Sequence, residues 1–156
     1  MPISTVGARW RGTAPYLLSI LRIVTAFLFM QYGTAKLFAF PAPLMPGGST
    51  VSITSQIGIA AVLETAGGLL MLVGLFSRPV AFLLSGEMAF AYFIGHAPRS
   101  FWPVVNQGTP AILFSFAWLY LSAAGPGPWS LDARRKRGPR TTHGATIHRH
   151  RHPSAA

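Results

Sequence analysis

The sequence predicts an all-α, polytopic membrane protein folded as a four-transmembrane-helix bundle. The chain of 156 residues is 51% hydrophobic and only 10% charged, and its mean hydropathy is +0.42. Soluble domains carry about 25% charged residues, so the composition favours lipid as the surrounding medium. A soluble four-helix bundle is the alternative, but its helices would need a polar stripe, which the second and third apolar runs almost entirely lack.

Four apolar runs, separated by breaks that contain proline and glycine, define the elements, because a helix needs about 20 apolar residues to cross the hydrocarbon core. The predicted spans are residues 15–40, 55–76, 79–95 and 109–124, all within a transmembrane domain of residues 14–132. Ser77-Arg78-Pro79 predicts a tight turn between the second and third spans. Residues 1–13 are expected to form a cytoplasmic N-terminal segment, and residues 133–156 a basic, His-rich, disordered cytoplasmic tail.

The excess of positive charge predicts the orientation of the chain. Lys and Arg total 13 against 3 Asp and Glu, a formal net charge of +10, and seven of the basic residues follow Leu131. A basic chain can bind nucleic acid, but a terminal cluster beside apolar spans favours an anchor to anionic lipid, so no nucleic-acid partner is expected. The positive-inside rule then places both termini in the cytoplasm. That side carries Arg9, Arg11, Arg78 and residues 134–137, and the other side carries Lys36 and Arg99.

Three ionisable residues inside the spans form a candidate intramembrane polar site, namely Glu64, Glu87 and Arg22. A rise of about 1.5 Å per residue places Arg22 and Glu87 roughly 10–12 Å from the cytoplasmic end and Glu64 roughly 18 Å from it. In the structural interpretation, Arg22 pairs with Glu87 or Glu64 and holds the bundle together. In the functional interpretation, the carboxylate left without a partner takes part in proton movement or binds the polar head of a ligand.

Small residues mark the expected contacts between helices. Gly67 and Gly68 share a helix face with Glu64, and Gly33 shares one with Arg22. Glycine lets a second backbone approach closely in a membrane bundle, so these three glycines are predicted helix-packing positions. The same spacing turns Glu64 toward a neighbouring helix and away from lipid.

A candidate outer-side polar site consists of Lys36, His96 and Asn106. Each residue also has an ordinary structural explanation. Lys36 would snorkel to the surface, His96 would cap the end of a helix, and Asn106 would precede the start of one. Together the three side chains would form the mouth of a site for a small ligand.

Aromatic residues make up 12% of the chain, and an aromatic-lined pocket beside a buried acid would suit a quinone or another flat apolar ligand. Packing against lipid or other helices is the alternative interpretation. The sequence contains no cysteine, which excludes disulfides, cysteine-ligated metal centres, thioether-attached haem and thiol redox cycles within this chain. No metal site and no covalently bound cofactor are expected, and no catalytic residue is assigned. His148, His150 and His152 are interpreted as part of a solvated tail, with weak metal chelation as the alternative.

Several short motifs occur in an order that is similar to one family. They are Gly33-x-x-Lys36, Glu64-x-x-Gly67-Gly68, residues 74–78, residues 87–89, the loop containing Asn106, and residues 125–132. On these residues, from about 17 to 132, the chain resembles the DoxX family of membrane proteins. One departure is Asn106-Gln107-Gly108-Thr109, because family members often carry an acidic residue after Asn-Gly-Gly at this place.

The resemblance implies a four-helix protein of the bacterial cytoplasmic (inner) membrane. Some relatives are linked to thiosulfate oxidation with quinone as acceptor, and others to membrane complexes for oxidative stress and thiol balance. The polar positions that match the family pattern are Arg22, Lys36, Glu64, Arg78 and Glu87.

The residues and the resemblance together support three functional hypotheses. The first is an accessory or quinone-linked subunit of a membrane oxidoreductase or oxidative-stress system, with Glu64 and Glu87 as proton or ligand-head sites and Arg22 tuning them. The second is a small proton-coupled transporter or permeation protein in which the same charges line a water-filled path. The third is a membrane scaffold without activity of its own. The expected partners are the lipid bilayer, oxidoreductase subunits and further copies of this chain.

Overall fold

The computed structural model describes residues 3–136, and every regular element in that part of the chain is a helix. The helices are α1 (Ile3–Phe38), α2 (Gln56–Val73), α3 (Ser77–Ala91), α4 (Thr109–Ala124) and α5 (Leu131–Lys136). Short helical turns are η1 (Pro46–Gly48) and η3 (Ala97–Arg99), and a π-helical turn, η2 (Tyr92–His96), continues α3. Most of the predicted tail, including its three alternating histidines, lies outside the described residues. Its first four residues, 133–136, were expected to be disordered but belong to α5.

Three stretches in the described part of the chain are long and apolar enough to cross a membrane. They are Trp10–Phe38 in α1, Gln56–Val73 in α2, and Ser77–Arg99, which runs from α3 through η3. The fourth predicted span corresponds to α4, which has 16 residues and is about 24 Å long. A helix needs about 17–25 residues to cross the hydrocarbon core, and α4 falls just short of this range, so the fourth crossing stays a prediction.

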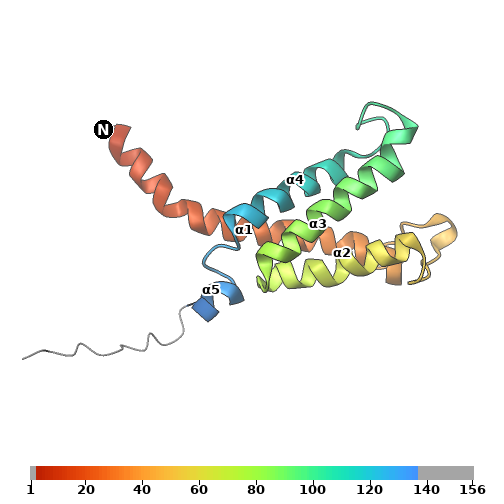
Figure 1. The fold of residues 1–156 in the computed structure, drawn as a ribbon, viewed down its shortest axis with the longest axis horizontal. Helices are drawn as coiled ribbons and strands as arrows, with labels where there is room; N and C mark the ends of the chain where they lie inside the picture. The colour runs from red at the N-terminus through yellow and green to blue at the C-terminus, as the bar shows by residue number, and fades with distance from the viewer. Residues whose placement is uncertain (1–2, 137–156) are drawn as a thin grey trace, which may run out of the picture.

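The bundle is built from two helix pairs, since α1 packs along α2 and α3 packs along α4 (Figure 1). Between the pairs lies an apolar core that includes Phe29, Met71, Leu84 and Trp118, each no more than 1% exposed. The ring of Phe29 meets the ring of Trp118 edge-on at 5.4 Å. Many large apolar side chains instead point outward from the helices, as expected for a surface that faces lipid.

The two ends of the bundle differ. At one end, which we call the α5 end, α2 finishes, α3 starts and α5 lies close by (Figure 1). From there α2 and α3 spread apart toward the opposite end, which we call the cavity end (Figure 1). The cavity end carries the connections 39–55 and 97–108.

The turn between α2 and α3 lies at residues 74–76, not at 77–79 as the sequence predicted. Gly74 adopts a left-handed conformation (φ 71°, ψ 47°) and ends α2, and its amide donates to backbone carbonyls in the last turn of that helix. Ser77 already belongs to α3. Pro79 falls in the first turn of α3, where a missing amide proton breaks no helical hydrogen bond.

α1 is longer than the predicted first span, because it begins at Ile3 and takes in most of the segment expected to precede the membrane. Figure 1 shows that this first part of α1 bends away from the bundle. Pro15 lies inside the helix, where it removes a backbone donor, and proline is the usual cause of such a bend.

The three predicted packing glycines all lie at helix contacts. A Cβ on Gly33 of α1 would come within 2.7 Å of the Ala61 carbonyl oxygen on α2. A Cβ on Gly68 would lie 3.1 Å from Cβ of Met30 on α1, and one on Gly67 would lie 2.7 Å from Leu84 on α3. Gly33 and Gly68 therefore set the close approach of α1 to α2.

Candidate functional site

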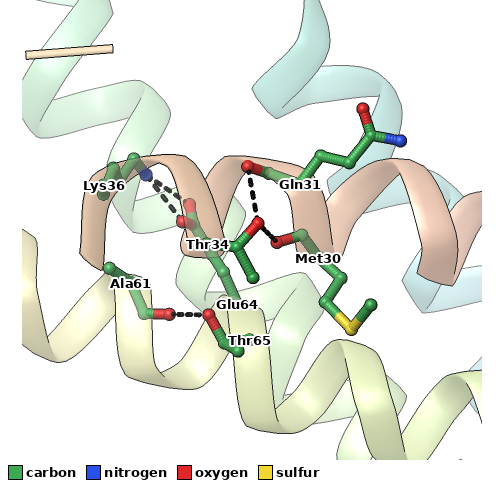
Figure 2. Close-up of polar contacts among 7 residues, drawn as sticks. All are labelled: Met30, Gln31, Thr34, Lys36, Ala61, Glu64 and Thr65. Carbon is green, nitrogen blue, oxygen red and sulfur yellow. Dashed lines mark hydrogen bonds and ion pairs between the residues drawn. The ribbon is translucent and has the colours of Figure 1, made fainter. Parts of the chain in front are cut away.

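The centre of the polar site is an ion pair between Lys36 of α1 and Glu64 of α2. The Lys36 ammonium donates to both carboxylate oxygens of Glu64, at 2.6 and 2.7 Å. Figure 2 shows Lys36 reaching across the contact between the two helices to this carboxylate. The side chains are 18% and 3% exposed, so both charges are largely withdrawn from solvent. The prediction that Lys36 snorkels to the surface is wrong, because its ammonium turns toward α2.

The ion pair forms part of the wall of a cavity of about 470 Å³ between α2 and α3. Its other polar lining residues include Gln56, Glu87 and His96, and most of the remaining wall is apolar. The apolar lining residues include Ile57, Ile59, Ala60, Leu63, Phe90 and Ile94. Ile57, Ile59, Phe90 and Ile94 are each at least half exposed, so the cavity opens sideways onto the apolar surface of the bundle.

Glu87 is the acid in this cavity that the ion pair does not neutralise. Its two carboxylate oxygens are buried and have no hydrogen-bond partner among the described residues. A buried carboxylate without a partner is unfavourable when charged, so it must either hold a proton or meet a donor that enters the cavity.

His96 ends the π-helical turn and lines both this cavity and a smaller one of about 100 Å³ toward α4. Its Nδ1 lies 2.9 Å from the backbone carbonyl oxygen of Asn106, which can only accept a hydrogen bond. Nδ1 therefore carries a proton in this contact, and Nε2 is the ring nitrogen that remains for a second contact. Lys36 and Glu64 line the smaller cavity as well, so the polar cluster separates the two spaces.

The side chain of Asn106 stabilises the connection 97–108 through two hydrogen bonds within it. It donates from Nδ2 to the Ser100 carbonyl oxygen at 2.8 Å and accepts from the Gly108 amide at 2.7 Å. Of the predicted outer-side residues, Lys36 and His96 thus line the cavity. Asn106 does not line it, but its backbone carbonyl oxygen positions the ring of His96.

Arg22 does not join the glutamates, and the expected pairing with Glu64 or Glu87 is wrong. The fully buried guanidinium donates instead to four backbone carbonyl oxygens. These are Met71 and Leu72 in the last turns of α2, and Pro126 and Trp129 in the segment before α5. The distances to Leu72, Pro126 and Trp129 are 2.7, 2.9 and 2.5 Å. Arg22 thus ties the strap, which we define as residues 125–132, to the end of α2.

The depths inferred by counting residues were also wrong. Glu64 lies nine residues before the end of α2, and Glu87 lies ten residues after the start of α3. Both are therefore about 14–15 Å from the α2–α3 turn and share a level. Arg22 lies closer to the α5 end than both glutamates, at the last turns of α2.

Asp132 closes the α5 end and was not singled out as a site residue. Its carboxylate accepts from the amides of Phe76 and Ser77, at 3.0 and 2.8 Å, and so caps the start of α3. Burial alone would raise the pKa of Asp132, but hydrogen bonds from Ser77 and Phe76 and the nearby charge of Arg135 lower it below its usual value. Its place at the end of the motif 125–132 was the sequence signal that could have identified it.

The residues that shape the cavity, including Lys36, Glu64, Glu87 and His96, all fall within residues 17–97, which match the family model described as DoxX. The chain belongs to the DoxX family. The match ends at residue 97, before α4, so it does not include the strap. The resemblance inferred from the sequence motifs was longer and ran to about residue 132.

Two relatives extend the comparison. An uncharacterized protein of Haemophilus influenzae is 41% identical over 121 residues, which cover 76% of this chain and 90% of that protein. The inner membrane protein YphA of Escherichia coli is 29% identical over 131 residues, which cover 77% of this chain and 91% of that protein. No solved structure matches the chain. With its three membrane-length apolar helices, this DoxX-family chain is a multi-pass membrane protein.

Proposed function

We propose that this protein is an accessory or quinone-linked subunit of an oxidoreductase or oxidative-stress system in the bacterial inner membrane. The observation that carries the proposal is the cavity of about 470 Å³ between α2 and α3, with a polar cluster at its base and an opening toward lipid. Its volume falls within the range of about 300–1,000 Å³ that is typical of small-molecule sites. The name of the Escherichia coli relative, an inner membrane protein, supports the location.

The lining residues fit the head of a quinone, which carries electrons and protons between membrane enzymes. Lys36 can donate a hydrogen bond to a carbonyl oxygen without leaving Glu64, because an ammonium has three donors and the ion pair uses two. Glu87 can hold or accept a proton, because its carboxylate oxygens are buried and lack a hydrogen-bond partner among the described residues. The apolar walls formed by Phe90 and Ile94 suit a flat ring and an isoprenoid tail that enters from lipid.

Electron transfer is assigned to a partner subunit. The sequence contains no cysteine, so no thiol and no cysteine-ligated iron–sulfur centre of this chain can supply electrons. We also propose that both termini face the cytoplasm, because Arg78, Arg134, Arg135 and Lys136 all lie at the α5 end.

A proton-coupled transporter is the second candidate. The observation that favours it is that Glu87 has no hydrogen-bond partner within residues 3–136. The packed core weighs against it. Below the cavity, Phe29, Met71, Leu84 and Trp118 fill the space between the helix pairs, and these four side chains are almost fully buried. A permeation path would have to cross this layer and then pass the buried Arg22.

Filling the cavity tests the proposal. The protein in lipid nanodiscs is titrated with a short-chain benzoquinone, and binding is followed by quenching of tryptophan fluorescence. Ala60→Leu places a larger side chain in the lining, whereas Ala66→Leu makes the same change at an exposed position of α2. We expect Ala60→Leu to weaken binding at least about tenfold and Ala66→Leu to leave it unchanged.

Equal affinities for the two leucine variants would refute the placement of the ligand, and the absence of any saturable binding would refute the quinone itself. Proton flux into liposomes is measured with the same protein. A flux driven by a gradient and abolished by Glu87→Gln would establish the transporter in its place.

A further inference from the structure

A second hollow, of about 290 Å³, lies at the α5 end, away from the ion pair and its cavity. Three cationic side chains line it, namely Arg78 from α3 together with Arg135 and Lys136 from α5. Its wall also includes Phe76, Pro126 and Asp132. Because α2 ends and α3 begins here, the hollow lies where the bundle leaves the membrane.

The charges around this hollow favour an anion. Asp132 is the acid in its wall, and both of its carboxylate oxygens already accept from backbone amides. Arg78 is held in place because Nη1 donates to the carbonyl oxygens of Ser122 and Ala123, at 3.1 and 2.6 Å. Within the described part of the chain, the remaining donors of Arg78 and those of the two α5 cations make no hydrogen bond, so they are left for a ligand.

The surroundings of the hollow are apolar and aromatic, which argues for a lipid. Phe76 is 57% exposed, and the guanidinium of Arg135 lies over its ring at 5.4 Å from the centroid. Trp129 does not line the hollow, but it lies on the same strap as Pro126 and Asp132, is 54% exposed and packs against Tyr16 of α1. Exposed aromatic rings beside cations are typical of the headgroup layer of a membrane.

We propose that this hollow binds the phosphate headgroup of an anionic phospholipid, with Arg78, Arg135 and Lys136 on the phosphate and the acyl chains along Phe76. Guanidinium groups suit phosphate because their donors form paired hydrogen bonds. The bound lipid lies on the surface that joins α3 to α5, beside the capping contact of Asp132. This site is independent of the cavity and of its proposed ligand.

The test measures lipid retention by native mass spectrometry of the full chain purified in a non-ionic detergent, with phosphatidylglycerol or phosphatidylcholine added. Lys136→Gln and the double variant Arg135→Gln/Lys136→Gln remove cations that line the hollow. Arg134→Gln is the matched control, because Arg134 lies on the same short helix but does not line the hollow. One cation near a membrane surface contributes about a factor of five in binding, so we expect roughly fivefold weaker retention of phosphatidylglycerol for the single variant and roughly tenfold or more for the double. The control is expected to change retention less than twofold.

Several results would overturn the proposal. An equal loss in the Arg134→Gln control would mean diffuse attraction without a site, and equal retention of phosphatidylcholine would mean that the charge is irrelevant. Competition by inorganic phosphate at the same concentration as the lipid would identify a free anion as the ligand. Thermal unfolding without added lipid checks that the single variant is folded. Among the described residues the side chain of Lys136 makes no hydrogen bond and no ion pair that its loss would remove.

Discussion

Replacing the two members of the Lys36–Glu64 ion pair, singly and together, separates a structural role of this pair from a functional one. Lys36→Met leaves a carboxylate that is only 3% exposed without its partner, and Glu64→Gln leaves an ammonium that is 18% exposed. The double variant Lys36→Met/Glu64→Gln removes both charges. If the pair only holds α1 to α2, the double variant should both fold and bind ligand like the parent protein.

The magnitude follows from the geometry. At a separation of 2.6 Å and an effective dielectric constant of about 20, the attraction is roughly 6 kcal/mol before desolvation is subtracted. Removing one partner of a buried pair lowers the free energy of unfolding by about 3–5 kcal/mol. We expect Lys36→Met to reach this range and Glu64→Gln to lose about 1–3 kcal/mol, because a long, partly exposed lysine can turn toward the surface. The double variant should return to within about 1 kcal/mol of the parent.

The free energies are obtained from unfolding in mixed micelles titrated with sodium dodecyl sulfate, and benzoquinone binding is measured on the same preparations. We expect the double variant to be stable but to bind the quinone at least about tenfold more weakly, since the ammonium that would contact the carbonyl oxygen is gone. The ion pair would be refuted if the double variant lost as much free energy of unfolding as the two single variants together. A stable double variant with unchanged affinity would refute its part in the binding site.

Three further perturbations test other parts of the structure. Arg22→Lys keeps the charge but cannot reach all four carbonyl oxygens, so it should lower the free energy of unfolding by about 3–5 kcal/mol, and a loss under 1 kcal/mol would contradict the tether. Gly33→Ala should lower the free energy of unfolding by about 1–3 kcal/mol, because the added Cβ would clash with the Ala61 carbonyl oxygen. Gly86→Ala should be neutral or slightly stabilising, because Gly86 faces open space. The lowered pKa of Asp132 means that its stabilising contribution is complete above about pH 4–5 and lost as the pH falls through the folded-state value. Asp132→Asn should therefore weaken the acid dependence of unfolding, and identical acid profiles would contradict the cap.

The helices could be predicted from the sequence because they depend on local patterns. Apolar runs, proline breaks and glycine spacing predicted the all-helical architecture, and Glu64 was identified because a charge in an apolar helix is conspicuous. Its partner could not be predicted in the same way. Whether Glu64 meets Arg22 or Lys36 depends on how far α1 slides along α2, and no local pattern encodes that offset. The close contact at Gly33 and Gly68 sets it.

The role of Arg22 was missed for a related reason. A buried arginine in a membrane helix was expected to pair with an acid, because acidic side chains can be identified in a sequence and free carbonyl oxygens cannot. Every residue has a carbonyl oxygen, so the four acceptors at the end of α2 and in the strap have no sequence signature. Arg22 finds them because Gly74 ends α2 there. The amide of Phe76 donates to Asp132 and not back to Leu72, and the Met71 carbonyl oxygen accepts from Arg22 in addition to the Gly74 amide.

The two ends of the bundle are therefore stabilised differently, and this difference explains where a ligand can bind. At the α5 end, Arg22 ties the strap to α2 and Asp132 ties it to α3, so three segments are held by hydrogen bonds to backbone groups. At the cavity end, α2 and α3 spread apart, and the Lys36–Glu64 pair near this opening joins α1 to α2. That pair does not include α3, and among the described residues Glu87 on α3 has no hydrogen-bond partner. A polar ligand head placed between Lys36 and Glu87 would supply the missing contact, so its binding should draw α3 toward α2 and reduce hydrogen exchange at residues 87–96.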